Sequence, residues 1–228
     1  MKKKFLLLAT IAFSSFIFCS CASVAPVNAS YEKAGTLGKG NVEVSGNFTH
    51  YIVSGDGESD AINNNYGFRV GYGLFDKVDL KFRYEKLVPV NLEEESQFKV
   101  NYMSIIPKFN LEAKKLSLMI PFSRYRFKDQ DFDGNTYSIA PQVIITFTSK
   151  SNQADFSVTI KGDYIINTGE DAENDFLLGM NLGAGLSENL DKWAFRPEIG
   201  YLFKPGESIG FWNFGFGVQF MIKPRSKK

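Results

Sequence analysis

The stretch RVGYGLFDKVDLKFRY, residues 69–84, contains a short turn between two segments in which apolar and polar side chains alternate. The apolar positions are Val70, Tyr72 and Leu74 before the turn, and Val78, Leu80, Phe82 and Tyr84 after it. The positions between them are almost all charged residues or glycine. Because successive side chains of a β-strand point to opposite faces, the pattern predicts a β-hairpin with one apolar and one polar face.

The same alternation recurs along the chain, whereas no amphipathic helix pattern follows the first 30 residues. The ten predicted strands span residues 41–53, 64–75, 78–88, 98–109, 116–127, 137–148, 155–166, 176–186, 193–203 and 211–221. These strands are about twice the usual length of about 5–6 residues, and they match the 9–11 residues that a tilted strand needs to cross a bilayer. Strand length therefore favours a membrane barrel.

The polar faces and the connections favour the same architecture. The polar faces are rich in charge and glycine, which suits the interior of a barrel better than a soluble core. The short connections are Phe75-Asp76-Lys77, Glu112–Lys115, Ser149–Ala154 and Ser187–Lys192. The long ones read GDGESDAINN, VNLEEESQ, KDQDFDGNT, NTGEDAEND and KPGESIG. Short turns on one side and long loops on the other are typical of transmembrane barrels.

We therefore predict an all-β fold: a single antiparallel up-and-down transmembrane β-barrel of about ten strands, residues 41–221. Eight or twelve strands, and a soluble β-sandwich, are the alternatives. An even number of strands would leave both termini on the short-turn, periplasmic side. The strand 116–127 fits least well, because its register turns Arg124 and Arg126 to the apolar face; a β-bulge near Ser123 would return them to the lumen or rim.

The chain begins with three lysines and a short apolar run, which predicts a secretory signal peptide, residues 1–20. Phe18-Cys19-Ser20-Cys21 resembles a lipoprotein processing site, and we expect acylation at Cys21; cleavage after Ala29 is the alternative. Residues 21–40 would then form a lipidated periplasmic segment and residues 222–228 a basic C-terminal tail. Both cysteines of the chain lie at this junction, so a structural disulfide is excluded.

Ten charged residues are predicted to face the lumen by their register. They are Arg69, Asp79, Lys81, Arg83, Glu85, Lys99, Lys161, Asp163, Arg196 and Glu198. They could line a conduction path, or they could fill the lumen as ion pairs. We favour filling, because barrels near eight strands are filled and unpaired charge in a narrow lumen is costly.

The net charge of +1 gives no general attraction to nucleic acid. The five long connections hold 14 acidic and 2 basic residues. Such loops could meet divalent cations that bridge lipopolysaccharide, or a basic partner; the simpler interpretation is that acidic residues keep the loops hydrated.

We expect no cofactor, with one exception. Asp129, Asp131 and Asp133 alternate before Gly134 and resemble the start of a calcium-binding loop, although the twelfth position holds Ala140 instead of an acid. A structural Ca²⁺ is therefore an alternative to a hydrated acidic loop.

His50 is the only histidine and raises the alternative of an outer-membrane hydrolase. No nucleophile motif accompanies it. We expect a non-enzymatic protein, with His50 in an interfacial aromatic belt beside Tyr51 and Tyr66.

The chain resembles the small outer-membrane β-barrel proteins of Gram-negative bacteria. NFGFGVQF (213–220) matches their final-strand signal, in which Asn213, Gly215, Val218 and Phe220 hold the polar, glycine and apolar positions. TLGKGNVEVSGN (36–47), YGLFDKVDLKFRY (72–84) and IPKFNLEAKKLSLMIPF (106–122) also resemble barrel lipoproteins of the Bacteroidetes type. The resemblance implies recognition by the barrel-insertion machinery and contact with outer-membrane lipid and lipopolysaccharide. We expect a structural or surface-interaction role, with a narrow pore for small solutes or lipophilic molecules as the alternative.

Overall fold

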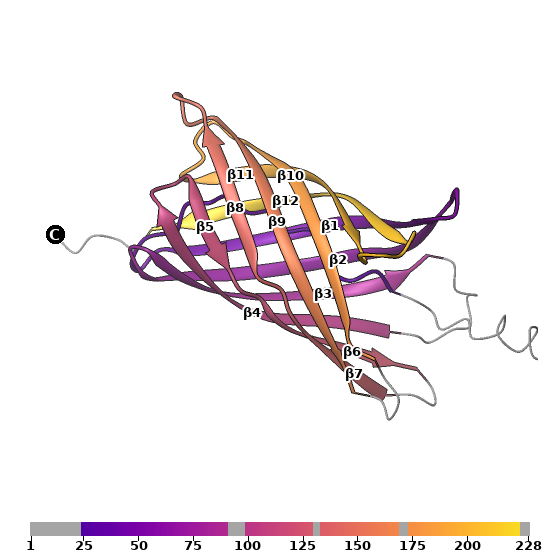
Figure 1. Ribbon diagram of the computed structural model, residues 1–228. Helices are drawn as coiled ribbons and strands as arrows, with labels where there is room; N and C mark the ends of the chain where they lie inside the picture. Colours follow the sequence, from indigo (N-terminus) through magenta and orange to yellow (C-terminus); the bar gives the residue numbers. More distant parts are fainter. Residues whose placement is uncertain (1–23, 91–98, 130–132, 169–172, 224–228) are drawn as a thin grey trace, which may run out of the picture.

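The chain forms a closed antiparallel β-barrel (Figure 1). The computed structural model describes residues 24–90, 99–129, 133–168 and 173–223. The strands are β1 (Val42–Gly55), β2 (Glu58–Phe75), β3 (Val78–Pro89), β4 (Lys99–Glu112), β5 (Leu116–Met119), β6 (Phe122–Lys128), β7 (Asp133–Ile139), β8 (Gln142–Thr148), β9 (Ala154–Asn167), β10 (Asp175–Leu186), β11 (Trp193–Phe203) and β12 (Gly210–Ile222). Within the described residues, no helix is long and apolar enough to cross a membrane.

The twelve segments make ten barrel strands. β5 and β6 are two parts of one strand, and both pair with β4; β7 and β8 are two parts of the next, and both pair with β9. The interruptions fall at Pro121 and Pro141, where proline has no N–H for the ladder. β1 pairs with β12 and closes the ring. The prediction of an antiparallel barrel of about ten strands is confirmed.

The outer face of the barrel is apolar. In the β2–β3 hairpin, Tyr72 and Phe82 are 48% and 40% exposed, whereas Lys81 and Arg83 are 2% and 5% exposed. Aromatic rings on the outer face contact one another across strands, as in the pair Phe68–Phe82 with ring centroids 6.3 Å apart. The apolar side chains of the opening hairpin therefore point outward and the cations inward.

The first long connection is a strand extension instead of a loop. Residues 55–64 were predicted as loop, but β1 and β2 continue to a turn at Asp56-Gly57, with φ of 49° and 86°. Asp-Gly is favoured in two-residue hairpin turns because both positions need positive φ. The β1–β2 hairpin consequently projects beyond its neighbours (Figure 1). Parts of the next three predicted loops, at 91–98, 130–132 and 169–172, lie outside the described residues.

The β-bulge expected near Ser123 is absent, and this expectation was wrong. Ser123 is buried on the inner face, while Arg124 and Arg126 stay on the outer face near the loops. There Arg126 Nη2 pairs with Asp133 at 2.7 Å, and Arg124 Nε donates to Asn135 Oδ1 at 2.8 Å. Local partners satisfy both arginines, so the register need not shift.

Residues 24–41, called the luminal segment below, run through the inside of the barrel. The end of the barrel with the long connections is the loop end, and the other is the turn end. Ala25 donates its N–H to Asn63 Oδ1 near the loop end, and Thr36 Oγ1 donates to the Asp76 carbonyl at the turn end. Residues 24–40, which were expected to belong to a lipidated periplasmic segment, are therefore inside the barrel instead, and residues 21–23 lie outside the described residues. The described chain therefore starts near the loop end, whereas β12, its last strand, finishes at the turn end (Figure 1).

Candidate functional site

Side chains of the barrel wall accept hydrogen bonds from the backbone of the luminal segment. Eight backbone N–H groups donate in this way, at 2.7 to 3.2 Å. The donor and acceptor pairs are Ala25 with Asn63, Val27 with Tyr125, Asn28 and Ala29 with Tyr51, Ser30 and Tyr31 with Glu198, Ala34 with Thr146, and Leu37 with Asp79. A buried backbone N–H without a partner is costly, so these acceptors make an irregular buried segment stable.

Wall side chains also donate to the carbonyl groups of the luminal segment. The pairs are Lys161 with Val27 O, Asn181 with Asn28 O, Arg83 with Ala29 O, Arg69 with Ser30 O, Gln219 with Tyr31 O, and Lys108 with Lys33 O and Gly35 O, at 2.5 to 3.0 Å. The donors come from both halves of the barrel. The wall therefore holds the segment by its backbone along most of its length.

Glu32 of the luminal segment lies in a cluster of buried cations. Its carboxylate is 2.8 Å from Arg69 Nη1, 2.7 Å from Lys81 Nζ and 2.8 Å from Lys108 Nζ. Glu43 of the wall is 2.9 Å from Lys81 Nζ and shares that cation. The Glu32 side chain is 1% exposed, so removing it would leave buried cations short of a counter-charge.

Polar side chains of the luminal segment also bind the wall. Asn28 Nδ2 donates to Asn181 Oδ1 at 3.0 Å and to Asn213 Oδ1 at 2.7 Å. The Tyr31 hydroxyl lies 2.6 Å from Thr49 Oγ1 and donates to the Phe48 carbonyl at 2.9 Å. These contacts join the segment to both sides of the β1–β12 seam.

Glycines on the inner face make room for these side chains. A Cβ built on Gly179 would lie 2.6 Å from Asn28 Oδ1, and one on Gly217 would lie 3.2 Å from the Cβ of Tyr31. Contacts under 3.0 Å require something to move. Some glycines of the inner face therefore leave room for side chains of the luminal segment.

Nine of the ten charged residues predicted for the lumen have buried side chains inside the barrel. Five of them form three ion pairs within the wall, Arg83–Glu85 at 2.5 Å, Lys161–Asp163 at 3.1 Å and Arg196–Asp155 at 2.8 Å. Asp79 and Glu198 instead accept N–H groups of the luminal segment. The five cations of this set are thus all in ion pairs, whereas these two carboxylates are held by N–H groups.

Lys99 is the exception, and its assignment to the lumen is corrected. Its side chain is exposed, because the inner face of β4 carries Val100, Tyr102, Ile106 and, at the turn end, Lys108. The inner face of β4 is apolar near the loop end, so alternation of polar and apolar residues gave the wrong side there. Lys108, which binds Glu32, was missed for the same reason.

The loop end of the lumen is apolar. Val27 packs with Leu87, Val100, Tyr102 and Tyr125 of the wall. A cavity of about 420 Å³ opens beside Val24 and is rimmed by the ion pairs of Lys204 with Asp175 and Glu207, both 2.8 Å. Hydrogen bonds to these two carboxylates raise the pKa of Lys204 above its ordinary value.

Other predicted sites are placed as follows. His50 Nδ1 lies 2.8 Å from Asn64 Oδ1, and Tyr51, expected beside it in an aromatic belt, is instead fully buried in the lumen. Of the calcium set, Asp133 pairs with Arg126, and Asp131 lies outside the described residues. Within the described residues, no cluster of three or more His, Cys, Asp or Glu could hold a metal ion.

The final-strand motif is divided between the two faces of β12. Asn213 and Gly215 lie inward, where Asn213 binds Asn28, and Phe220 lies outward with 55% of its side chain exposed. Val218 pairs in register with Gly46 of β1. The proposed sorting signal is therefore also part of the closing seam.

Solved outer-membrane barrels have a similar fold. The translocator domain of the autotransporter NalP from Neisseria meningitidis has 13% identity and a TM-score of 0.51, covering 80% of this chain and 88% of that chain. Ail of Yersinia pestis has 12% identity and a TM-score of 0.37, covering 81% and 99%. The N-terminal barrel domain of Pseudomonas aeruginosa OprF has 16% identity and a TM-score of 0.37, covering 81% and 99%. No protein-family model and no curated protein sequence matches the chain. At these identities the similarity concerns the fold.

Proposed function

We propose that this chain is an outer-membrane barrel whose lumen is sealed by its own luminal segment. We further propose that the protein acts through the acidic loops at its loop end. The observation that carries the proposal is the luminal segment, which is hydrogen-bonded to the wall from Ala25 to Leu37. An apolar outer face, a matching final-strand motif and the barrel fold support a place in the outer membrane.

The sealed lumen favours a surface role over conduction. Glu32 and its three cations occupy the lumen, and the apolar cluster around Val27 occupies its loop end. A solute would have to displace both groups and strip buried charges of their partners, which is costly. The acidic loops remain as the surface for contact with cation-bridged lipopolysaccharide or a basic partner. A Ca²⁺ site at Asp129, Asp131 and Asp133 is a further hypothesis for that surface.

The luminal segment supports processing at Cys21 over cleavage after Ala29. Cleavage after Ala29 would remove Val27 and Asn28, whose contacts with Tyr125, Asn181 and Asn213 fill the lumen. Cys21 itself lies outside the described residues. Three residues span at most about 11 Å, so an acylated Cys21 would be near Val24, at the loop end. The lipid would then lie on the outer side, contrary to the expectation of a periplasmic N-terminus.

Mass spectrometry of the mature protein tests this processing. An N-terminal peptide that starts at Cys21 with acyl mass is expected, and the Cys21→Ser variant should lose that mass. A mature chain that starts at Ser30 would refute acylation at Cys21, and it would also mean that residues 24–29 are not part of the mature protein.

Planar-bilayer recording tests the seal. The wild-type protein, shown to be folded by its gel shift on boiling, is expected to give conductance equal to protein-free controls. Deletion of residues 24–34 should give open-channel steps if the remaining wall folds. Stable channel steps from the wild type would overturn the proposal, whatever the deletion variant does.

An outer-membrane hydrolase based on His50 is the remaining alternative. The partner of His50 is the amide of Asn64, which supports a structural contact. Acyl-hydrolase activity lost in His50→Ala but kept in wild type would favour the enzyme, and equal activity in both would remove its support.

A further inference from the structure

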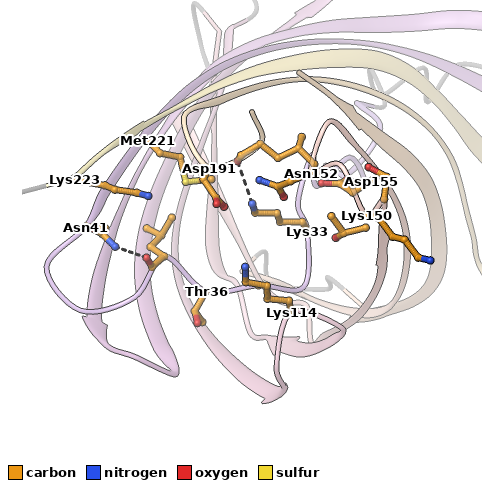
Figure 2. Close-up of a pocket in the computed structure, with 15 residues that line it drawn as sticks. Lys33, Thr36, Asn41, Lys114, Lys150, Asn152, Asp155, Asp191, Met221 and Lys223 are labelled. Carbon is orange, nitrogen blue, oxygen red and sulfur yellow. Dashed lines mark hydrogen bonds between the residues drawn. The ribbon is translucent and has the colours of Figure 1, made fainter. Parts of the chain in front are cut away.

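A cavity of about 600 Å³ opens at the turn end of the lumen (Figure 2). Its lining comes from the luminal segment, the turns after β4, β8 and β10, and the end of β12. The volume lies within the usual range for small-molecule sites. The cavity is separate from the one at the loop end, and the last part of the luminal segment, Lys33 to Leu37, forms one of its walls.

The charge of this cavity is predominantly positive. Four lysines line it, Lys33, Lys114, Lys150 and Lys223. Two carboxylates also line it, but Asp155 is already held by two hydrogen bonds of 2.8 Å from Arg196. Asp191 is therefore the one acid of the lining not already bound by an arginine. A concave site with charge of one sign concentrates its field on an oppositely charged ligand.

Lys33 is the most informative of the four lysines. It is partly buried, and its ammonium donates to the Leu190 carbonyl at 3.3 Å. The six fully buried cations of the lumen each have a carboxylate within 3.1 Å. Lys33 makes no ion pair with a carboxylate of the described residues, so its charge lacks a direct counter-charge within this part of the chain.

Lys114 lines the same cavity as Lys33 and contacts the luminal segment at Gly35. A Cβ built on Gly35 would be 3.7 Å from Lys114 Cγ, so the turn residue folds over the luminal segment. The side chains of Lys33 and Lys114 both extend into the cavity (Figure 2). Lys114 also has φ of 60°, a conformation that favours glycine or asparagine.

We propose that this turn-end cavity binds a phosphate group, with Lys33 and Lys114 as its main contacts. Ammonium groups are compact point charges that suit phosphate oxygens, and a phosphate can accept from several donors at once. The phosphate could belong to a soluble phosphate compound or to a phospholipid headgroup at the membrane surface.

Titration calorimetry of the full-length protein with inorganic phosphate, at constant ionic strength, tests the site. The Lys33→Gln/Lys114→Gln variant should bind on the order of 100-fold more weakly, because two charge-assisted contacts are lost. The matched control is Lys77→Gln, an exposed turn residue at the same end that does not line the cavity, and it should bind like wild type.

Vesicles distinguish the two sources. Co-flotation of the protein, held in its own bilayer disc, with phosphatidylglycerol-containing vesicles but not with phosphatidylcholine vesicles would assign a lipid headgroup, provided that the double variant loses it. Binding of inorganic phosphate with no vesicle preference would assign a soluble compound. No binding of either, or equal binding by the double variant, would overturn the proposal. The gel shift on boiling verifies that each variant is folded.

Discussion

The luminal segment meets two different environments within a few residues. Val27 lies among aliphatic and aromatic side chains near the loop end, whereas Glu32 lies among three cations deeper in the lumen. Apolar burial is non-directional, while charged hydrogen bonds require defined positions. We infer that the two regions have different roles. The charged part around Glu32 fixes the register of the segment, and the apolar part around Val27 excludes water.

The largest effect is expected from breaking the charged part. Glu32→Gln leaves Arg69, Lys81 and Lys108 buried with less counter-charge, and should lower the free energy of unfolding by about 3–5 kcal/mol. Urea unfolding of the protein in lipid vesicles measures it. The control is Glu112→Gln, which removes an exposed pair with Lys115 and should change little. Similar losses in both variants would refute a special role for Glu32.

A smaller effect is expected where the wall makes room for the segment. Gly179→Ala should destabilise by roughly 1–3 kcal/mol, because its Cβ would lie 2.6 Å from Asn28 Oδ1. Gly183→Ala on the same strand meets its nearest atom at 3.5 Å and should be tolerated. Hydrogen exchange at the amides of residues 25–31 should rise in the first variant only; a rise in neither would mean that the segment does not depend on this contact.

A substitution in the apolar part should lower the free energy of unfolding by less than Glu32→Gln does. Val27→Ala removes two buried methyl groups while its backbone bonds to Tyr125 and Lys161 remain, so a loss of about 1–2 kcal/mol is expected. Val44→Ala on the outer face serves as control. A loss from Val27→Ala that exceeds that from Glu32→Gln would reverse the comparison drawn above.

The smallest effect is expected at the rim, outside the lumen. The raised pKa of Lys204 means that its ion pairs favour the folded state below the unfolded pKa of about 10.4, and that this contribution is lost only as the pH rises through the higher folded value. Lys204→Met should therefore differ from wild type by the same small amount at pH 6 and pH 9. A difference that changes between these two values would contradict the assignment.

The wall could be predicted from sequence because its signal is local. Side chains alternate with a period of two, so Tyr72, Lys81 and Phe82 fall on the correct faces without knowledge of the rest of the chain. The rule fails at Lys99, where the inner face of β4 is itself apolar. It also fails at residues 55–64, where the strength of an Asp-Gly turn outweighed the polar composition of the stretch.

The luminal segment could not be predicted in this way. Residues 24–41 have no strand or helix period, and their contacts come from residues up to 188 positions away, as from Gln219 to Tyr31. The sequence did show glycine and charge on the inner faces, and Gly179 and Arg69 are among those that meet the segment. Alternation alone does not tell whether such residues meet one another or a further part of the chain.

The path of the luminal segment restricts the order of assembly. The segment enters at one end of the barrel and leaves at the other, and β1 follows it directly. Once β1 has paired with β12 the ring is complete, and the segment could enter afterwards only by threading lengthwise through a passage lined with charged groups. Closure of the barrel around the segment would need no such threading, so we expect the luminal segment to be in place before β1 and β12 pair.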